Sequence, residues 1–445
     1  MQLSVYKEHY KETIRLGVPI MLGQLGIIVV GFADNIMVGH HSTAELAAAS
    51  FVNNFFNLVF IAGMGFSYGL TPIIGGYFAQ KEYAKAGETL KNSLCINLIV
   101  GLLLSLCMLT LLLNIHILKQ PEELMPYIVP YYILQLFSVI FAMLFNSFKQ
   151  FSDGTTDTVT PMCVMLGANV LNIIGNYLLI YGNFGCPELG LTGAGISTLA
   201  SRILTFGIFY VLFTKHSRYK LYREGFKKGT VNRANIGNLV RLGLPVGFQM
   251  GVETGSFSLS VIMMGWLGST ALAAHQVAGV ITTLGFMVYY GIAAAVTIRV
   301  SNFRGRNDWP AIRHASFAGL HLVMGTATIV VLLIGIFRNI MGYIITPEKE
   351  VVELVGLVSD PVSGRRRTAN PLRQRSARHL GCQIHGLYGF LLPLRTGTSH
   401  RLPVRVHFWL GSHRHLVRLP DQPDHARTVT LETFQSIDNK KIGYD

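Results

Sequence analysis

The sequence predicts an all-α membrane protein that crosses the bilayer many times. Half of its 445 residues are apolar and only 13% are charged, which is typical of polytopic membrane proteins. Several apolar runs are long enough to cross the ~30 Å hydrocarbon core of a bilayer as helices. An internal repeat further predicts that these helices form two related bundles.

The repeat joins two segments at a constant offset of 226 residues, measured from Arg15 to Arg241. RLGVP at 15–19 returns as RLGLP at 241–245, and the same offset without a gap carries LAA at 46–48 to LAA at 272–274. Chance does not hold register that long in two apolar segments. We interpret the match as an internal duplication.

Apolar spans are expected at nine places before residue 355. They lie at about 13–38, 46–76, 91–117, 125–149, 159–182, 192–214, 237–264, 269–300 and 312–341. Six spans precede the second copy, and because six is even, both copies enter the membrane from the same side. This predicts two six-helix bundles related by a pseudo-twofold axis along the membrane normal.

Four regions follow from this pattern. Residues 1–214 form an N-lobe of six transmembrane helices, and 215–236 form a basic linker. Residues 237–355 form a C-lobe with helices 7–9 and the start of helix 10, so the second bundle is incomplete as written. Residues 356–445 form a tail that is unlike the rest of the chain.

Loop charge predicts the orientation. Nineteen Lys and Arg side chains fall on one side of the predicted spans, against three on the other. The nineteen lie in 7–15, 81–91, 215–241 and 299–313, with Lys149. Positive loops stay in the cytoplasm, so we expect a multi-pass protein of the plasma (inner) membrane with its N-terminus and linker cytoplasmic. The charged N-terminus does not resemble a removable signal peptide.

The tail has a composition of its own. Residues 356–430 hold 12 Arg and no Lys, with seven His and no clean apolar span. A shift by one nucleotide can encode DGLQIxYANALRGISDVK over 366–383 and GWGLIGIWFAFP over 409–420, and both look like membrane-transporter sequence. We interpret 356–430 as frameshifted.

Intramembrane carboxylates are the first candidate site residues. Asp34 lies near the end of the first span, and a carboxylate there is costly unless it faces a polar cavity. The first helix of the second copy has its lone acid at Glu253, seven residues before Ser260, the equivalent of Asp34. Seven residues are two turns, so both acids use the same helix face. Solvation of Asp34 at the membrane interface is the simpler alternative.

The motifs around these acids resemble the multidrug and toxic compound extrusion (MATE) family, in its bacterial NorM-like branch. They are FADNIMVG, LAAAS and GLTPIIGGYFAQ in the first copy, with LPVGFQMGVE, LAAHQV and GIAAAVTIRVSNFRG in the second. The resemblance implies two six-helix bundles around a cleft and export of organic, often cationic and aromatic, compounds in exchange for Na⁺ or H⁺. It implies an ion site at Asp34 and a second at Glu253 and Gln276. The aspartate expected on the tenth helix falls at Arg366.

Asn172 and Asn176 lie on one face of the fifth span with Asn169, since spacings of three and four align along a helix. The resemblance supports Asn172 and Asn176 as partners of Asp34, although interhelical hydrogen bonding alone would also explain them. We expect Asp34 to take up and release a proton, or Na⁺ to bind at Glu253 or Asp34. Weaker candidates for the substrate cleft are Gln24, Phe32, Asn35, Thr198, Tyr289 and Tyr290, together with Phe55 and Phe56.

Several functions are excluded or ranked lower. The five cysteines are scattered and imply no disulfide or metal site, and no phosphate-binding loop supports an ATP-driven pump. We expect no enzyme activity, no cofactor and no nucleic-acid partner, and a monomer in the bilayer. A flippase of lipid-linked precursors would need a basic cleft, and the spans have little internal Arg beyond Arg202. A third hypothesis is a membrane anchor with a basic binding tail.

Overall fold

The computed structural model describes residues 2–115, 121–265 and 269–345. These residues belong to one compact unit, Met1–Leu394, and the regular elements within them are all helices. The all-α prediction is confirmed. The predicted start of helix 10 and the tail lie outside the described residues, and so does Arg366.

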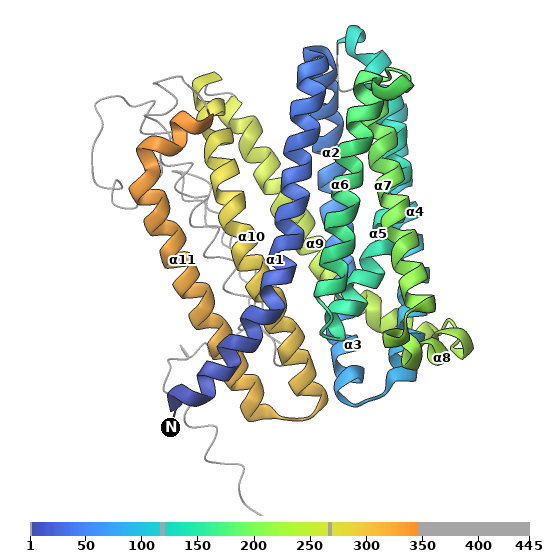
Figure 1. Ribbon diagram of the computed structural model, residues 1–445, viewed down its shortest axis with the longest axis vertical. Coiled ribbons are helices and arrows are strands. Elements are labelled where there is room, and N and C mark those ends of the chain that lie inside the picture. Colours follow the sequence, from blue (N-terminus) through green and yellow to red (C-terminus); the bar gives the residue numbers. More distant parts are fainter. Residues whose placement is uncertain (1, 116–120, 266–268, 346–445) are drawn as a thin grey trace, which may run out of the picture. The chain divides into compact units, whose positions relative to one another are not determined.

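Eleven α-helices are described in this part of the chain (Figure 1). They are α1 (Gln2–His41), α2 (Thr43–Ser67), α3 (Leu70–Ala79), α4 (Tyr83–Leu113), α5 (Met125–Gly154), α6 (Val159–Tyr181), α7 (Gly190–Lys215), α8 (Lys220–Lys228), α9 (Arg233–Gly265), α10 (Ser269–Gly305) and α11 (Trp309–Ile345). Each predicted span coincides with a long helix, except that the second is divided between α2 and α3. By length and composition, seven stretches of the described residues could cross a membrane.

The junction between α2 and α3 packs closely against α9. Gly69 lies between the two helices, and a Cβ placed on it would be 2.7 Å from the backbone nitrogen of Gly243 in α9. Only a residue without a side chain allows two backbones to approach this closely. The sequence does not predict the break itself.

The two copies of the repeat contact each other through equivalent positions. A Cβ on Gly291 of α10 would lie 2.8 Å from Cβ of Met21 in α1, and one on Gly65 of α2 would lie 2.9 Å from Cα of Gly247 in α9. The offset of 226 carries Met21 to Gly247 and Gly65 to Gly291. One contact is therefore the symmetry mate of the other, as a duplicated bundle requires.

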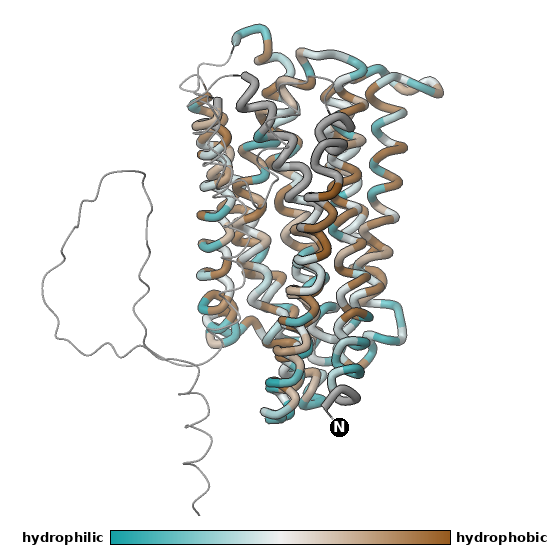
Figure 2. Tube along the Cα trace, turned by 90° about the vertical axis from the view of Figure 1, so that its left-hand side faces the viewer, coloured by the Kyte–Doolittle hydropathy of each residue, from teal (hydrophilic) through white to brown (hydrophobic). Residues whose placement is uncertain are grey.

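Aromatic side chains pack one end of the N-lobe helices. The buried ring of Phe148 stacks on Phe209 with centroids 5.4 Å apart, and Phe151 meets Tyr222 of α8 edge-on at 5.2 Å. The predicted linker thus contains a helix that is held against the bundle. In Figure 2, hydrophilic residues gather at the helix ends and turns, and hydrophobic residues predominate along the helices.

Lys149, which is counted above among the loop charges, lies inside a helix. It lies within α5, its side chain is 7% exposed, and its Nζ forms an ion pair with Asp153 Oδ2 at 3.0 Å. Both side chains of this ion pair are buried, so the charge of Lys149 is paired inside the protein. Lys149 therefore does not contribute to the loop bias that predicts the orientation.

Candidate functional site

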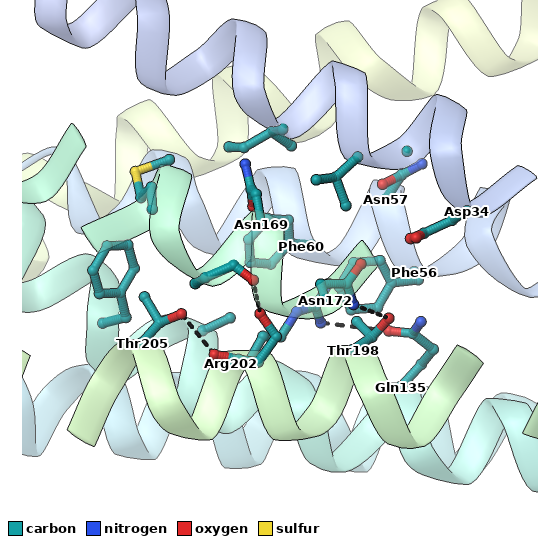
Figure 3. Close-up of a pocket in the computed structure, with 18 of the residues that line it drawn as sticks. Asp34, Phe56, Asn57, Phe60, Gln135, Asn169, Asn172, Thr198, Arg202 and Thr205 are labelled. Carbon is teal, nitrogen blue, oxygen red and sulfur yellow. Dashed lines mark hydrogen bonds between the residues drawn. The ribbon is translucent and has the colours of Figure 1, made fainter. Parts of the chain in front are cut away.

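The N-lobe contains a partly open cavity of about 430 Å³. Five helices supply its walls, α1, α2, α5, α6 and α7, and most of the lining side chains are amides, aromatics or small residues. Figure 3 shows side chains from these helices converging on this space. A space of this size, with a few polar groups on apolar walls, is typical of a small-molecule site.

Asp34 lies on one wall of the cavity, where α1 passes α6. Asn176 Nδ2 donates to Asp34 Oδ1 at 2.5 Å. The Asn172 amide satisfies its neighbours when its nitrogen faces the carboxylate: it then donates to Asp34 Oδ1 at 3.1 Å, and its oxygen accepts from the Thr198 backbone N at 3.3 Å. The spacing of four on α6 thus delivers two amide groups to one carboxylate.

A polar atom without a partner lies beside this carboxylate. Asn176 is fully buried, and its Oδ1 accepts no hydrogen bond from any described residue. A buried amide oxygen without a donor is costly, and such groups are rare in folded proteins. A protonated Asp34 carboxyl group could donate to this oxygen if the Asn176 amide turned.

The opposite wall carries a hydrogen-bonded network around Arg202 of α7. Its NH1 donates to Ser138 Oγ and, at 3.4 Å, to Gln135 Oε1. Gln135 Nε2 in turn donates to the Tyr131 hydroxyl at 2.9 Å, which donates to Asn53 Oδ1 at 3.1 Å. These bonds join α7, α5 and α2 and fix the guanidinium against the cavity.

Two aromatic rings of α2 also hold Arg202. Its Cζ lies 4.5 Å from the ring centroid of Phe56 and 5.6 Å from that of Phe60. Both separations are within the range of a cation–π interaction. Phe56 was a weak cleft candidate, and it does line the cavity.

The structure brings together only some of the weaker candidates. Gln24, Asn35 and Thr198 line the cavity with Asp34 and Asn172. Phe32 is 45% exposed and is not part of the lining. Tyr289 and Tyr290 lie on α10 outside it, and the Tyr290 ring is 6.1 Å from that of Tyr68.

The C-lobe candidates do not form a comparable site among the described residues. Glu253 lies on α9, partly exposed, and no hydrogen bond to it is found in the described part. Gln276 lies on α10, in a stretch whose side chains are outside the described residues. His275 is 4% exposed, and neither ring nitrogen has a described partner.

Sequence reasoning missed several residues of the cavity. Asn53 and Asn57 are four apart on α2, as are Phe56 and Phe60, and this spacing could have indicated a polar and aromatic face. The paired charge of Lys149 at the cavity wall had no such signal. Within the described residues, no cluster of three or more His, Cys, Asp or Glu side chains could hold a metal ion.

Comparison with known proteins agrees with the fold and with the position of the repeats. The MatE family model matches residues 19–178 and 245–359. A probable multidrug resistance protein NorM of Photorhabdus laumondii is 28% identical over 423 residues, which cover 90% of this chain and 91% of that protein. NorM of Vibrio cholerae is 30% identical over 355 residues, covering 78% and 76%.

Solved structures share the architecture. The eukaryotic MATE transporter AtDTX14 superimposes with a TM-score of 0.71 at 18% identity and 86% coverage of both chains. A variant of the Vibrio cholerae MATE transporter VcmN gives 0.73 at 18% identity, covering 88% of this chain and 90% of that one. The MatE match spans both copies of the repeat and more than half of the residues, so the chain belongs to the MatE family of membrane transporters and is not an enzyme.

Proposed function

We propose that this protein is a secondary antiporter that exports organic, often cationic and aromatic, compounds in exchange for protons. The observation that carries the proposal is the Asp34 carboxylate, held by Asn176 and Asn172 in the wall of a cavity large enough for a small molecule. The names of the NorM relatives, which are multidrug resistance proteins, support the cargo class.

The groups around Asp34 favour a proton over Na⁺ as the exchanged ion. Ionised, the carboxylate accepts hydrogen bonds from two amide nitrogens, which are donors and offer no oxygen to a metal ion. Protonated, it needs an acceptor, and the unpartnered Asn176 Oδ1 supplies one if the amide turns. Na⁺ prefers several oxygen ligands, which would require both amides to turn at once.

Ion exchange supplies enough energy for export. One charge moving inward across ~100 mV yields about 2.3 kcal/mol, equivalent to roughly a fiftyfold gradient of cargo. Alternating access would separate the two copies at the glycine contacts of Gly65 with Gly247 and of Gly291 with Met21.

The test is proton-driven transport by an Asp34→Asn variant in everted vesicles. We expect the variant to insert normally and to lose export of a fluorescent organic cation, because an amide cannot exchange a proton near neutral pH. If residues 356–430 are frameshifted, the chain as written should transport weakly. The variant is therefore made both in that sequence and in a gene corrected by one nucleotide.

Two separate ion gradients distinguish proton exchange from Na⁺ exchange. A pH gradient without Na⁺ should drive export, and a Na⁺ gradient at uniform pH should not. Ser260→Ala, at the position of the second copy that is equivalent to Asp34 and outside the cavity lining, is the matched control and should retain proton-driven export. Undiminished export by Asp34→Asn would remove the proposed role.

We also propose that the linker is cytoplasmic. Its helix α8 exposes Lys228, and the hydrogen bond from Lys228 Nζ to Glu224 Oε1 at 2.7 Å raises the pKa of this lysine, which therefore stays charged. Positive charge of this kind favours the cytoplasmic side. In a cysteine-free background, Lys227→Cys should react with an impermeant maleimide only after the cells are opened.

Phe184→Cys is the matched control for the orientation. Phe184 lies in the turn between α6 and α7, at the other end of α7 from the linker, and is 90% exposed. It should react in intact cells under the same conditions. The reverse labelling pattern would invert the proposed topology.

A further inference from the structure

The cavity contains a second charged side chain, Arg202, whose role the proposed proton exchange at Asp34 does not explain. Arg202 has no ion-pair partner among the described residues: its contacts are Ser138, Gln135 and the rings of Phe56 and Phe60. A charged side chain inside a transmembrane bundle is costly and is therefore a functional candidate by default. Hydrogen bonds from Ser, Gln or Asn could hold these helices together without a charge.

The charges around the cavity can be counted. Among the side chains that line it, the charged ones are Asp34, Lys149 and Arg202. Lys149 is neutralised by its ion pair with Asp153. With Asp34 ionised the cavity is therefore neutral as a whole, and with Asp34 protonated it carries the single positive charge of Arg202.

We propose that Arg202 is a specificity-determining residue that makes the cavity reject cations whenever Asp34 holds a proton. The inference rests on the proposed proton exchange at Asp34 and deepens it. Loss of the Asp34 charge alone would only remove an attraction, leaving a flat cation free to remain on the aromatic walls. The fixed Arg202 guanidinium then repels the cation. Protonation of Asp34 and release of the cation therefore occur together.

The aromatic contacts reinforce this effect. A flat cation would be attracted to the faces of Phe56 and Phe60, but Arg202 already occupies that side of both rings. The cation is therefore directed toward Asp34, the group that responds to protons. A neutral or anionic compound of the same shape has no such restriction.

The effect is large enough to measure. Two like charges about 10 Å apart in a partly buried site, at an effective dielectric constant of about 20, change affinity on the order of tenfold. The experiment measures binding of three ligands with one aromatic frame, carrying a trimethylammonium group, a neutral group or a carboxylate. The full-length protein in nanodiscs is compared with Asp34→Asn, Asp34→Asn/Arg202→Gln and Asp34→Asn/Arg202→Lys.

Asp34→Asn mimics the protonated state and should bind the anion at least tenfold more tightly than the cation. Adding Arg202→Gln should restore cation binding about tenfold, weaken the anion by a similar factor and leave the neutral ligand unchanged. Arg202→Lys keeps the charge and should behave like Asp34→Asn alone. The neutral ligand reports whether each variant keeps its fold.

Equal cation affinity in Asp34→Asn and Asp34→Asn/Arg202→Gln would overturn the inference, as would a cation preference in Asp34→Asn. The second criterion does not depend on the folding of any Arg202 variant. Failure of the proposed function gives a different result. In that case the unmodified protein binds no cation, while Asp34→Asn still selects the anion through Arg202.

Discussion

The two copies of the repeat share their packing and differ in their chemistry. Gly65 of the first copy and Gly291 of the second are equivalent, and a Cβ added to either glycine would lie within 2.9 Å of an atom in the opposite copy. At the position equivalent to Asp34, the second copy has Ser260. Its hydroxyl donates to Ser256 O within its own helix at 2.9 Å.

This difference separates positions that both copies keep from positions at which the copies have diverged. A glycine at a close backbone contact cannot be replaced without moving a helix, so both copies keep it. A carboxylate in a membrane is useful only where a cavity and its donors surround it. In the described residues, those surroundings exist in the N-lobe, and the C-lobe acid is displaced by two helical turns to Glu253.

The largest effect on drug efflux is expected from restoring the missing helices of the second copy. Arg365, Arg366 and Arg367 would lie together in a would-be span, and each costs about 2.5–3.5 kcal/mol at the centre of a bilayer. A gene corrected by one nucleotide near codon 356 should supply three apolar spans and the missing aspartate. Drug efflux from cells that carry the corrected gene should exceed efflux with the sequence as written by tenfold or more.

Resequencing of the coding DNA across codons 350–435 is the direct control for that comparison. An authentic frame together with equal efflux from both genes would show that the tail is native and that the frameshift interpretation is wrong. Equal protein levels, measured by immunoblot against the N-lobe, exclude a difference in expression.

Much of the fold and part of the candidate site could be predicted from the sequence. Apolar run length and the offset of 226 predicted the nine spans and the pairing of copies, because both depend on local composition. The spacing of Asn172 and Asn176 predicted one helix face. The network from Arg202 through Gln135 to Tyr131 could not be predicted, since it depends on the register between α7 and α5, which no local pattern encodes.

A smaller effect should follow from opening the ion pair beside the N-lobe cavity. Lys149→Met would leave Asp153 buried and unpaired, which costs about 3–5 kcal/mol in known cases. The side chains are only 7% and 4% exposed, so solvent cannot compensate. We expect a clear fall in the melting temperature of the purified protein in detergent.

The double variant Lys149→Met/Asp153→Leu separates pairing from packing. Replacing both charges with apolar groups of similar size should recover most of the lost stability, since a buried pair contributes little net free energy. If the double variant is as unstable as Lys149→Met, the side chains matter for their hydrogen bonds or shape rather than for their mutual charge.

The smallest effect is expected at Ser260, the counterpart of Asp34. Its hydroxyl is already satisfied by the carbonyl of Ser256, a bond that any helical serine can make and that contributes little to stability. Ser260→Ala should therefore leave proton-driven export within about twofold of the unmodified protein, while Asp34→Asn abolishes it. The two variants are assayed in the same vesicles and with the same cation. A loss of export in Ser260→Ala comparable to that in Asp34→Asn would mean that both copies contribute to ion exchange at equivalent positions, and the division of chemistry between the copies would have to be abandoned.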